Sequence, residues 1–130
     1  MGHSKYSFSK AEKLTGKKKV EELFRTGSSF YLNDIQVRYL KTKEPSSPHQ
    51  ILISVPKRNF KRAVDRNLLK RRIREAYRLN KEIIATKADS DSFYIAFIYL
   101  SKQILPFKDI QAQLIKCLKR LGNIKAGDHE

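Results

Sequence analysis

The chain has 130 residues, of which 40% are apolar, and this is enough to bury one hydrophobic core of ordinary size in a single domain. Its 28 Lys and Arg residues outnumber 13 Asp and Glu residues, and the net charge of +15 far exceeds what a small domain needs for solubility. We therefore expect a strongly anionic partner, with nucleic acid first, an anionic membrane surface second and a merely solvated basic face as the least favoured explanation.

Cysteine and histidine usage excludes several further classes. Cys117 is the only cysteine, so an intramolecular disulfide and a cysteine-rich zinc site are impossible. The three histidines, His3, His49 and His129, show no metal-ligand spacing. No apolar run approaches the roughly 20 residues that span a bilayer, and no signal-peptide pattern opens the chain. We expect a cytoplasmic protein in a reducing compartment.

The first half of the chain predicts one short helix and two strands. Residues 1–10 are polar and are predicted to form a flexible tail. A helix is predicted to begin at Thr15 or Gly16 and to end at Gly27, and its shared apolar face comprises Val20, Leu23 and Phe24. An alternating pattern predicts a half-buried strand around Ile35, Val37 and Tyr39. After a proline-containing loop at 44–49, residues 50–55 predict a second strand, and the two strands suggest a hairpin.

The second half predicts a long helix, a central strand and a closing helix. Pro56 stops the preceding strand, and the long helix is predicted to begin between Asn59 and Ala63. Its apolar side gathers Leu69, Ile73, Ala76, Tyr77, Ile83 and Ile84. After a polar break at 86–92, residues 93–100 predict a central strand covered at least partly on both faces. An amphipathic helix then runs from about Pro106 to Gly122, with Cys117 as an ordinary interior thiol.

The predicted fold is therefore a small α+β sandwich with the order α-β-β-α-β-α and three strands. Residues 11–122 form its single domain, and residues 123–130 form a second flexible tail. The long helix is a crossover between the second and third strands. If those strands are parallel neighbours, general topology favours a right-handed connection.

The long helix and its lead-in carry an unusual concentration of positive charge. Between residues 57 and 78 there are ten Lys or Arg residues and two acids, Asp65 and Glu75. Six of the ten recur at every fourth residue and form a ridge along the helix: Arg58, Arg62, Arg66, Lys70, Arg74 and Arg78. Like charges at this spacing repel, so the ridge does not stabilise the helix and instead indicates a polyanionic ligand. Arg66 projects toward the apolar sector and is expected to lie against a flanking element.

No arrangement of residues for protein-based catalysis is visible. The three histidines are badly placed in the sequence to serve a serine nucleophile, and the acids do not form the carboxylate cluster of a two-metal nuclease. The glycines are isolated, so a phosphate-binding loop is also absent. We infer that a partner performs any reaction.

Residues 55–78 resemble the signature of the bacterial ribonuclease P protein component. That family has a strand ending in Val-x-Lys-Lys or Val-x-Lys-Arg and then a basic RNR segment on a long helix; this chain has Val55-Pro56-Lys57-Arg58 as its lead-in. The positions that agree are Lys57, Arg58, Ala63, Val64, Arg66, Asn67, Lys70, Arg71, Arg74 and Glu75. A weaker resemblance covers roughly residues 10–120 and includes Leu14, Phe24 and Gly27. The departures are Leu68 in place of the second basic residue of the triplet, Asp65 where a basic residue is frequent, and Val20 where the first helix usually has an aromatic residue.

The resemblance implies a function and a set of binding residues. Such a protein is the small subunit of a ribonucleoprotein whose RNA subunit, with magnesium, removes the 5′ leader from precursor tRNA. Magnesium is then held mainly by the RNA, with no metal tightly bound to the protein and no obligate protein partner or membrane. The resemblance also implies a left-handed crossover, against the general topological preference, and a cleft for the leader between the sheet and the first helix.

The resemblance and the chemistry of the residues together predict two sites. The residues expected to bind the RNA subunit are Lys57, Arg58, Lys61, Arg62, Arg66, Asn67, Lys70, Arg71, Arg74 and Arg78. The residues expected near the single-stranded leader are Phe24, Phe30, Tyr31, Tyr39, Lys17, Lys18 and Lys19, because bases stack on aromatic rings and lysines neutralise phosphates. Each aromatic residue has core packing as its competing role. The competing explanation for the lysines is a solvated helix face.

Two alternatives remain open at this point. The first is a generic RNA-binding or ribosome-associated protein with no processing role, against which the ordered match at 55–78 argues. The second is a DNA-binding or membrane-surface helix, which is less favoured because the basic helix is embedded between strands.

Overall fold

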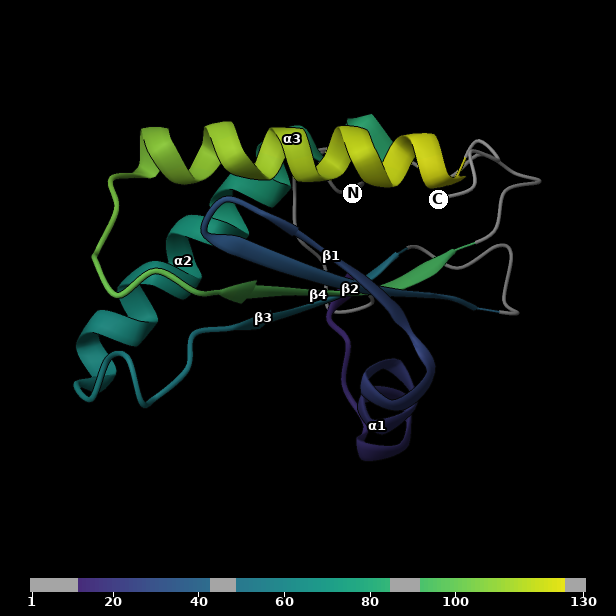
Figure 1. Ribbon diagram of the computed structural model, residues 1–130, viewed down its shortest axis with the longest axis horizontal. Helices are drawn as coiled ribbons and strands as arrows, with labels where there is room; N and C mark the ends of the chain where they lie inside the picture. The colour runs from purple at the N-terminus through teal and green to yellow at the C-terminus, as the bar shows by residue number, and fades with distance from the viewer. Residues whose placement is uncertain (1–11, 43–48, 85–91, 126–130) are drawn as a thin grey trace, which may run out of the picture.

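The structure, a computed structural model, describes residues 12–42, 49–84 and 92–125. Within these residues the elements in chain order are α1 (Lys17–Thr26), β1 (Ser28–Leu32), β2 (Ile35–Lys41), β3 (Gln50–Ser54), α2 (Ala63–Asn80), the 3-10 turn η2 (Lys81–Ile84), β4 (Phe93–Tyr99) and α3 (Phe107–Lys125). The strands form one open sheet, with α2 and α3 on one side and α1 on the other (Figure 1). The predicted α+β class and the predicted order of helices are confirmed.

The first predicted strand is in fact preceded by another strand, and the two form a hairpin. β1 pairs with β2 in antiparallel register, with Phe30 opposite Val37 and Tyr31 opposite Gln36. Asn33 occupies the turn with a φ of 54°, a conformation that asparagine tolerates better than most residues. Sequence reasoning missed β1, although an Asn-Asp pair between apolar stretches is a usable turn signal.

The predicted hairpin between residues 35–39 and 50–55 is wrong. The order of strands in the described sheet is β1-β2-β4-β3, so β4 lies between β2 and β3. β4 is antiparallel to β2 and parallel to β3, and α2 is therefore the predicted crossover between parallel neighbours. Its handedness stays a prediction from the family resemblance.

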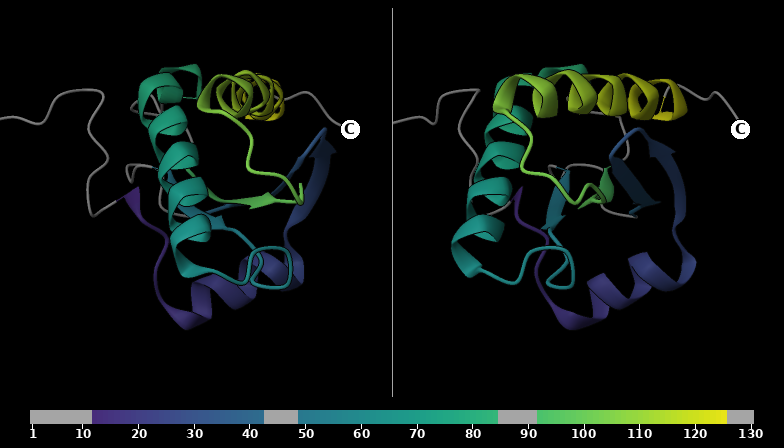
Figure 2. Two further views of the ribbon diagram at one scale, coloured as in Figure 1. Left: turned by 90° about the vertical axis from the view of Figure 1, so that its left-hand side faces the viewer. Right: turned by 60° about the vertical axis from the view of Figure 1, so that its left-hand side comes forward.

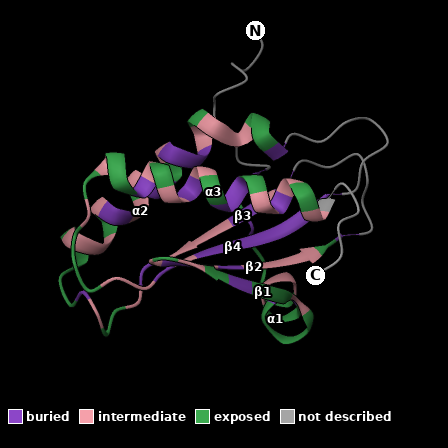
Figure 3. Cartoon of the chain, turned by 45° about the horizontal axis from the view of Figure 1, so that its top comes forward, coloured by how far each residue is buried: buried purple, intermediate pink, exposed green. Residues whose placement is uncertain are grey.

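The main core lies between the sheet and the pair of helices α2 and α3. β4 is buried along almost its whole length, as predicted for the central strand (Figure 3). α2 contributes Leu69, Ile73, Ala76 and Tyr77, and η2 contributes Ile84. Ile83 is 36% exposed, so its predicted place on the buried side is wrong, because the chain turns into η2 beyond Asn80 and leaves the regular helical wheel.

The closing helix begins close to the predicted position but ends later. α3 continues through Gly122 to Lys125, and half-buried Ile124 packs against the core, so the predicted end at Gly122 is wrong. A Cβ at Gly122 would lie 3.4 Å from the carbonyl oxygen of Ile83, which is an ordinary van der Waals contact, so α3 packs beside η2 without requiring a glycine there. Cys117 is fully buried as predicted, and burial raises the pKa of its thiol to about 12.

α1 has the predicted bounds and packs closely on β2. Gly16 precedes it with a φ of 98°, which favours glycine, and Gly27 follows it. A Cβ at Gly27 would lie 2.4 Å from the carbonyl oxygen of Leu23 and 2.9 Å from that of Tyr39. Gly27 therefore lets the end of α1 approach the backbone of β2.

Replacing Gly27 by alanine is expected to push α1 away from the sheet and to lower the free energy of unfolding by about 1–3 kcal/mol. The matched control is Gly122→Ala, which meets no closer neighbour than 3.4 Å and improves helix propensity. It is expected to be neutral or stabilising by up to about 1 kcal/mol. Urea denaturation measures both, and an equal loss in the two variants would contradict the close-approach explanation.

Of the two chain ends that the sequence predicted to be flexible, residues 1–10 and 126–130 lie outside the described residues, as do most of the loops at 44–49 and 86–92, whereas residues 123–125 belong to α3. Within the described part of the chain, no helix is both long enough and apolar enough to cross a membrane.

Candidate nucleic-acid interface

The side of α2 turned away from the core carries most of the predicted cations. The helix buries one stripe of side chains, and its other positions are exposed or half-buried. The exposed members of the predicted set are Lys57, Arg58, Lys61, Arg62, Asn67, Arg71 and Arg74, and the half-buried ones are Arg66, Lys70 and Arg78. We call these ten residues the basic surface. It covers α2 and the loop that precedes it, and this loop extends past the sheet toward the side of α1 (Figure 2).

The loop between β3 and α2 is fixed by an aromatic anchor. Phe60 is 7% exposed and packs against Tyr99 with ring centroids 5.9 Å apart, within the main core. The amide of Asn59 donates to the carbonyl oxygen of Pro56 at 3.2 Å and closes a turn. The exposed cations on either side of Phe60 are therefore presented from an anchored loop. Sequence reasoning missed this anchor, although Phe60 is the one aromatic residue between positions 57 and 76.

Arg66 ties the same loop to the first turn of α2. Its Nη1 donates to the carbonyl oxygens of Phe60 and Lys61, both at 2.8 Å. The expectation that Arg66 lies against a flanking element is confirmed. Arg66 thus holds the loop that carries its neighbouring cations, in addition to any contact of its own with RNA.

We expect Arg66→Ala to lower the free energy of unfolding by about 1–3 kcal/mol, because two backbone carbonyls lose a charged donor. Arg71→Ala removes an exposed cation on the same helix and is expected to stay within about 0.5 kcal/mol of the parent. Both variants are expected to bind the RNA subunit more weakly. Chemical denaturation and filter binding separate the two effects, and equal stabilities would refute the loop-fixing role.

Two cations of the basic surface have acidic neighbours on α2. Arg78 and Glu75 form a double hydrogen bond, with Nε 3.0 Å from Oε1, and the hydrogen bond from Arg78 lowers the pKa of Glu75. Arg62 Nε lies 3.8 Å from Asp65 Oδ2. Solvent-accessible pairs of this kind contribute little free energy to folding.

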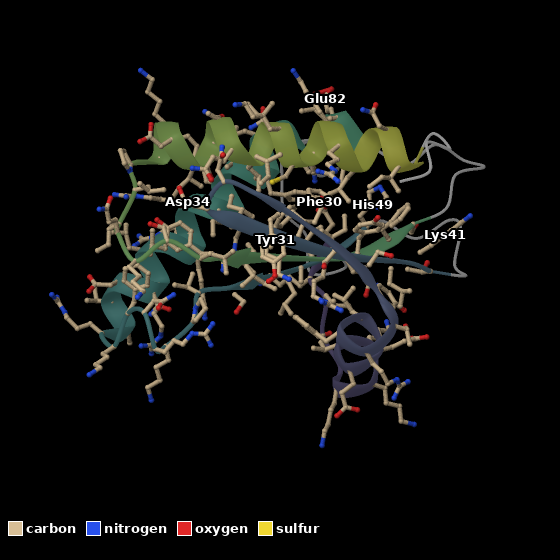
Figure 4. The ribbon with its side chains drawn as sticks, viewed as in Figure 1. Phe30, Tyr31, Asp34, Lys41, His49 and Glu82 are labelled. Carbon is tan, nitrogen blue, oxygen red and sulfur yellow. The ribbon has the colours of Figure 1, made fainter. Side chains whose placement is uncertain are left out.

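The aromatic residues predicted near the leader divide between the two faces of the sheet. Phe30 is 6% exposed and lies in the main core, stacked beneath Arg120 with Cζ 4.4 Å from the ring centroid. Tyr39 is half-buried and packs on Phe30 at 6.0 Å. Grouping these two with Phe24 on one surface is therefore wrong, because side chains alternate along a strand and these two point toward α3. Figure 4 shows Phe30 on the α3 side of β1.

Tyr31 and Phe24 lie on the α1 side of the sheet and are accessible. Tyr31 is 65% exposed and Phe24 is 38% exposed. Strand pairing places Tyr31, Gln36, Ile98 and Ser54 in one row across all four described strands. α1 covers the neighbouring rows, where its Leu23 and Val20 pack with Leu14, Leu40, Leu52, Tyr94 and Ala96. We call the uncovered row, together with Phe24 and Arg38, the open sheet surface.

The predicted lysines at the start of α1 also differ in their surroundings. Lys17 and Lys18 are exposed, whereas Lys19 is half-buried with its Nζ 5.9 Å from the ring centroid of Tyr94. Lys19 therefore rests against the α1 side of the sheet. Lys17 and Lys18 add positive charge at the N-terminal end of α1.

No cluster of three or more His, Cys, Asp or Glu residues that could hold a metal ion occurs in the part of the chain that the structure describes. His49, expected in a loop, is buried: its Nδ1 accepts from the amide of Phe93 at 3.0 Å, and its Nε2 lies 2.5 Å from the carbonyl oxygen of Ile84. Because Nδ1 accepts, Nε2 carries the proton and donates. His49 therefore has a structural role between η2 and β4.

The fold and the basic surface define the class of protein: a small α+β domain that presents an anchored, strongly cationic helix to a polyanion. A family model described as ribonuclease P matches residues 8–122. The chain belongs to the ribonuclease P protein family.

Curated relatives and solved structures agree with this assignment. The ribonuclease P protein component of Porphyromonas gingivalis (strain ATCC 33277) is 33% identical over 123 residues, which cover 92% of this chain and 90% of that protein. The component from Chlorobium phaeobacteroides is 35% identical, covering 76% of this chain and 70% of that protein. The structure of the RNase P protein from Thermotoga maritima has a TM-score of 0.69 at 26% identity, covering 84% of this chain and 96% of that one. The Staphylococcus aureus RNase P protein has a TM-score of 0.68 at 25% identity, covering 86% and 96%.

The general function of the chain follows from its membership of this family. The chain is a component of a ribonucleoprotein endonuclease involved in tRNA processing, and its partner is an RNA subunit. The exposed cations of α2 are the feature of this chain that suits such a partner.

Proposed function

We propose that the protein binds the catalytic RNA through the basic surface and the 5′ leader of precursor tRNA through the open sheet surface. The RNA subunit, with magnesium, then hydrolyses the phosphodiester and gives the mature 5′ end of the tRNA. The observation that carries this proposal is the separation of the two surfaces in one domain. The cations lie on α2 and its loop, while the accessible aromatic residues lie on the face of the sheet that α2 does not cover.

The basic surface suits a folded RNA because its charge is both dense and held in place. Phosphates offset the repulsion between the cations, and binding releases condensed counterions. Arginine predominates in the set and can grip a phosphate with two parallel hydrogen bonds. Asn67 is exposed between these cations and can add a neutral hydrogen bond to RNA.

The open sheet surface suits a single strand because it offers rings and polar groups on a flat support. Tyr31 is exposed on the sheet, and directly paired Gln36 lies beside it. Unpaired bases stack on such rings in a sequence-tolerant way. Lys17 and Lys18, which are exposed on α1, would neutralise phosphates of the same strand.

Magnesium belongs with the RNA in this proposal. Magnesium is usually bound through phosphates and only one or two carboxylates, and the described residues contain no cluster of three or more His, Cys, Asp or Glu side chains. The protein contributes binding and orientation of the two RNAs. The proposal requires no further protein and no membrane, and a role in tRNA processing is consistent with a cytoplasmic location.

A generic RNA-binding or ribosome-associated role is the alternative. The basic surface alone is compatible with it. The open sheet surface favours leader binding instead, because it combines two accessible rings, Tyr31 and Phe24, with the polar side chain of Gln36, and this combination suits the stacking of unpaired bases.

Reconstitution with a bacterial ribonuclease P RNA and a labelled precursor tRNA tests the proposal. The protein alone is expected to leave the substrate intact, and addition of the RNA subunit is expected to give 5′ cleavage at magnesium concentrations where the RNA alone is nearly inactive. Cleavage by the protein alone would refute an RNA-based active site. Unchanged RNA activity, or preferential binding of the protein to anionic vesicles, would favour the alternatives.

A further inference from the structure

Arg38 of β2 holds the end of α1. It lies in the row of the sheet next to Gln36, on the side that α1 covers. Its Nη2 donates to the carbonyl oxygen of Phe24 at 2.8 Å and to that of Gly27 at 3.4 Å. The last carbonyls of a helix lack intrahelical donors and carry the negative end of the helix dipole, so a guanidinium is a favourable partner for them.

The same side chain also supports the ring of Phe24. The Cζ of Arg38 lies 5.4 Å from the ring centroid, which is within the range of a cation–π contact. Arg38 therefore contacts Phe24 twice, once at its carbonyl oxygen and once at its ring. Phe24 remains 38% exposed, so one part of the ring is left for another contact.

The Nε of Arg38 is buried and has no hydrogen-bond partner among the described residues, so the contacts of the guanidinium with the end of α1 are made by Nη2.

We infer that Arg38 is a positioning residue for the leader of precursor tRNA: it fixes the ring of Phe24 beside the row of Tyr31, Gln36 and Ile98. This inference rests on the proposed leader-binding function of the open sheet surface. A ring that is already oriented loses less conformational freedom when a base stacks on it, so binding is tighter. Arg38 acts through Phe24 and needs no contact of its own with the RNA.

The test compares holoenzymes containing the parent protein, Arg38→Ala, Arg38→Lys and Phe24→Ala. The substrates are one precursor tRNA with a long leader and the same tRNA with a one-nucleotide leader. Arg38→Ala is expected to raise KM for the long leader about fivefold, with little change in kcat and none for the short leader. Arg38→Lys keeps the cation but replaces the planar guanidinium by a single ammonium group, and it is expected to show a smaller rise in KM than Arg38→Ala. An unchanged dissociation constant for the RNA subunit shows that each variant is folded.

A double variant decides how Arg38 acts. In the Phe24→Ala background, adding Arg38→Ala is expected to change KM by less than about twofold, because the two residues act as one unit. If the increases in KM from the two replacements are additive, and the slope of log K against log salt for the long-leader substrate falls by about one, Arg38 contacts a phosphate directly. This result would overturn the positioning role. Loss in Phe24→Ala but none in Arg38→Ala would overturn the inference alone. No leader effect in Phe24→Ala would overturn the proposed leader surface and the inference with it.

Discussion

Replacing Arg71 and Arg74 together by alanine is expected to weaken binding of the RNA subunit by on the order of tenfold at moderate salt. Both side chains are exposed on α2, so the loss reflects phosphate contacts and not packing. The slope of log K against log salt is expected to fall by about two, one for each lost contact. Titration of labelled RNA subunit at several salt concentrations measures both quantities.

The matched control removes the same charge from another helix. Lys116 and Lys119 are exposed on α3, and their double replacement by alanine leaves the basic surface intact. This variant is expected to change affinity by no more than about threefold, because charges beyond a screening length act weakly. Equal losses in the two double variants would mean that total charge, and not the basic surface, determines binding.

Phe24→Ala is expected to weaken binding of precursor tRNA to the holoenzyme by about 1–3 kcal/mol, or roughly 5- to 150-fold, through the loss of one stacking contact. The RNA subunit should bind as before, because Phe24 lies on α1, across the sheet from α2. Binding of the holoenzyme to substrates with long and one-nucleotide leaders provides the measurement.

A second apolar truncation serves as the control for Phe24. Ile104 is 43% exposed in the loop before α3, and Ile104→Ala removes a comparably accessible apolar side chain. It is expected to leave both leader binding and binding of the RNA subunit unchanged. A Phe24→Ala loss that is the same for long and one-nucleotide leaders would place the defect in tRNA or RNA-subunit contacts instead of in leader stacking.

The sequence predicted the basic surface well because its signal is local. Lys57 to Arg78 carry enough charge, at helical spacing, to indicate a polyanion, and the buried stripe of Leu69, Ile73 and Tyr77 orients the helix without knowledge of the rest of the chain. The extent of α1 was also local information, since Gly16 and Gly27 flank it.

The pairing of the strands and the residues of the open sheet surface could not be predicted from local sequence signals. The two strands around 35–39 and 50–55 suggested a hairpin, but β3 does not pair with β2. β4, which begins at Phe93, 52 residues after β2 ends at Lys41, occupies that edge of β2 instead. Local sequence patterns also did not predict on which face of the sheet each candidate aromatic residue lies. Phe30 and Tyr31 are adjacent in sequence, yet one is 6% and the other 65% exposed, because the hairpin register sends them to opposite faces.

The sequence by itself determined the class of ligand, the family resemblance and the helix that carries the charge, since composition and short-range periodicity are properties of the chain. Only the tertiary structure decided which residues share a surface. It brought Arg38 of β2 against Phe24 of α1, placed Phe30 in the core with Tyr39 packed against it, and anchored the basic loop through Phe60. Each of these contacts joins segments separated along the chain, and their geometry is set by strand register and helix packing, which no local pattern encodes.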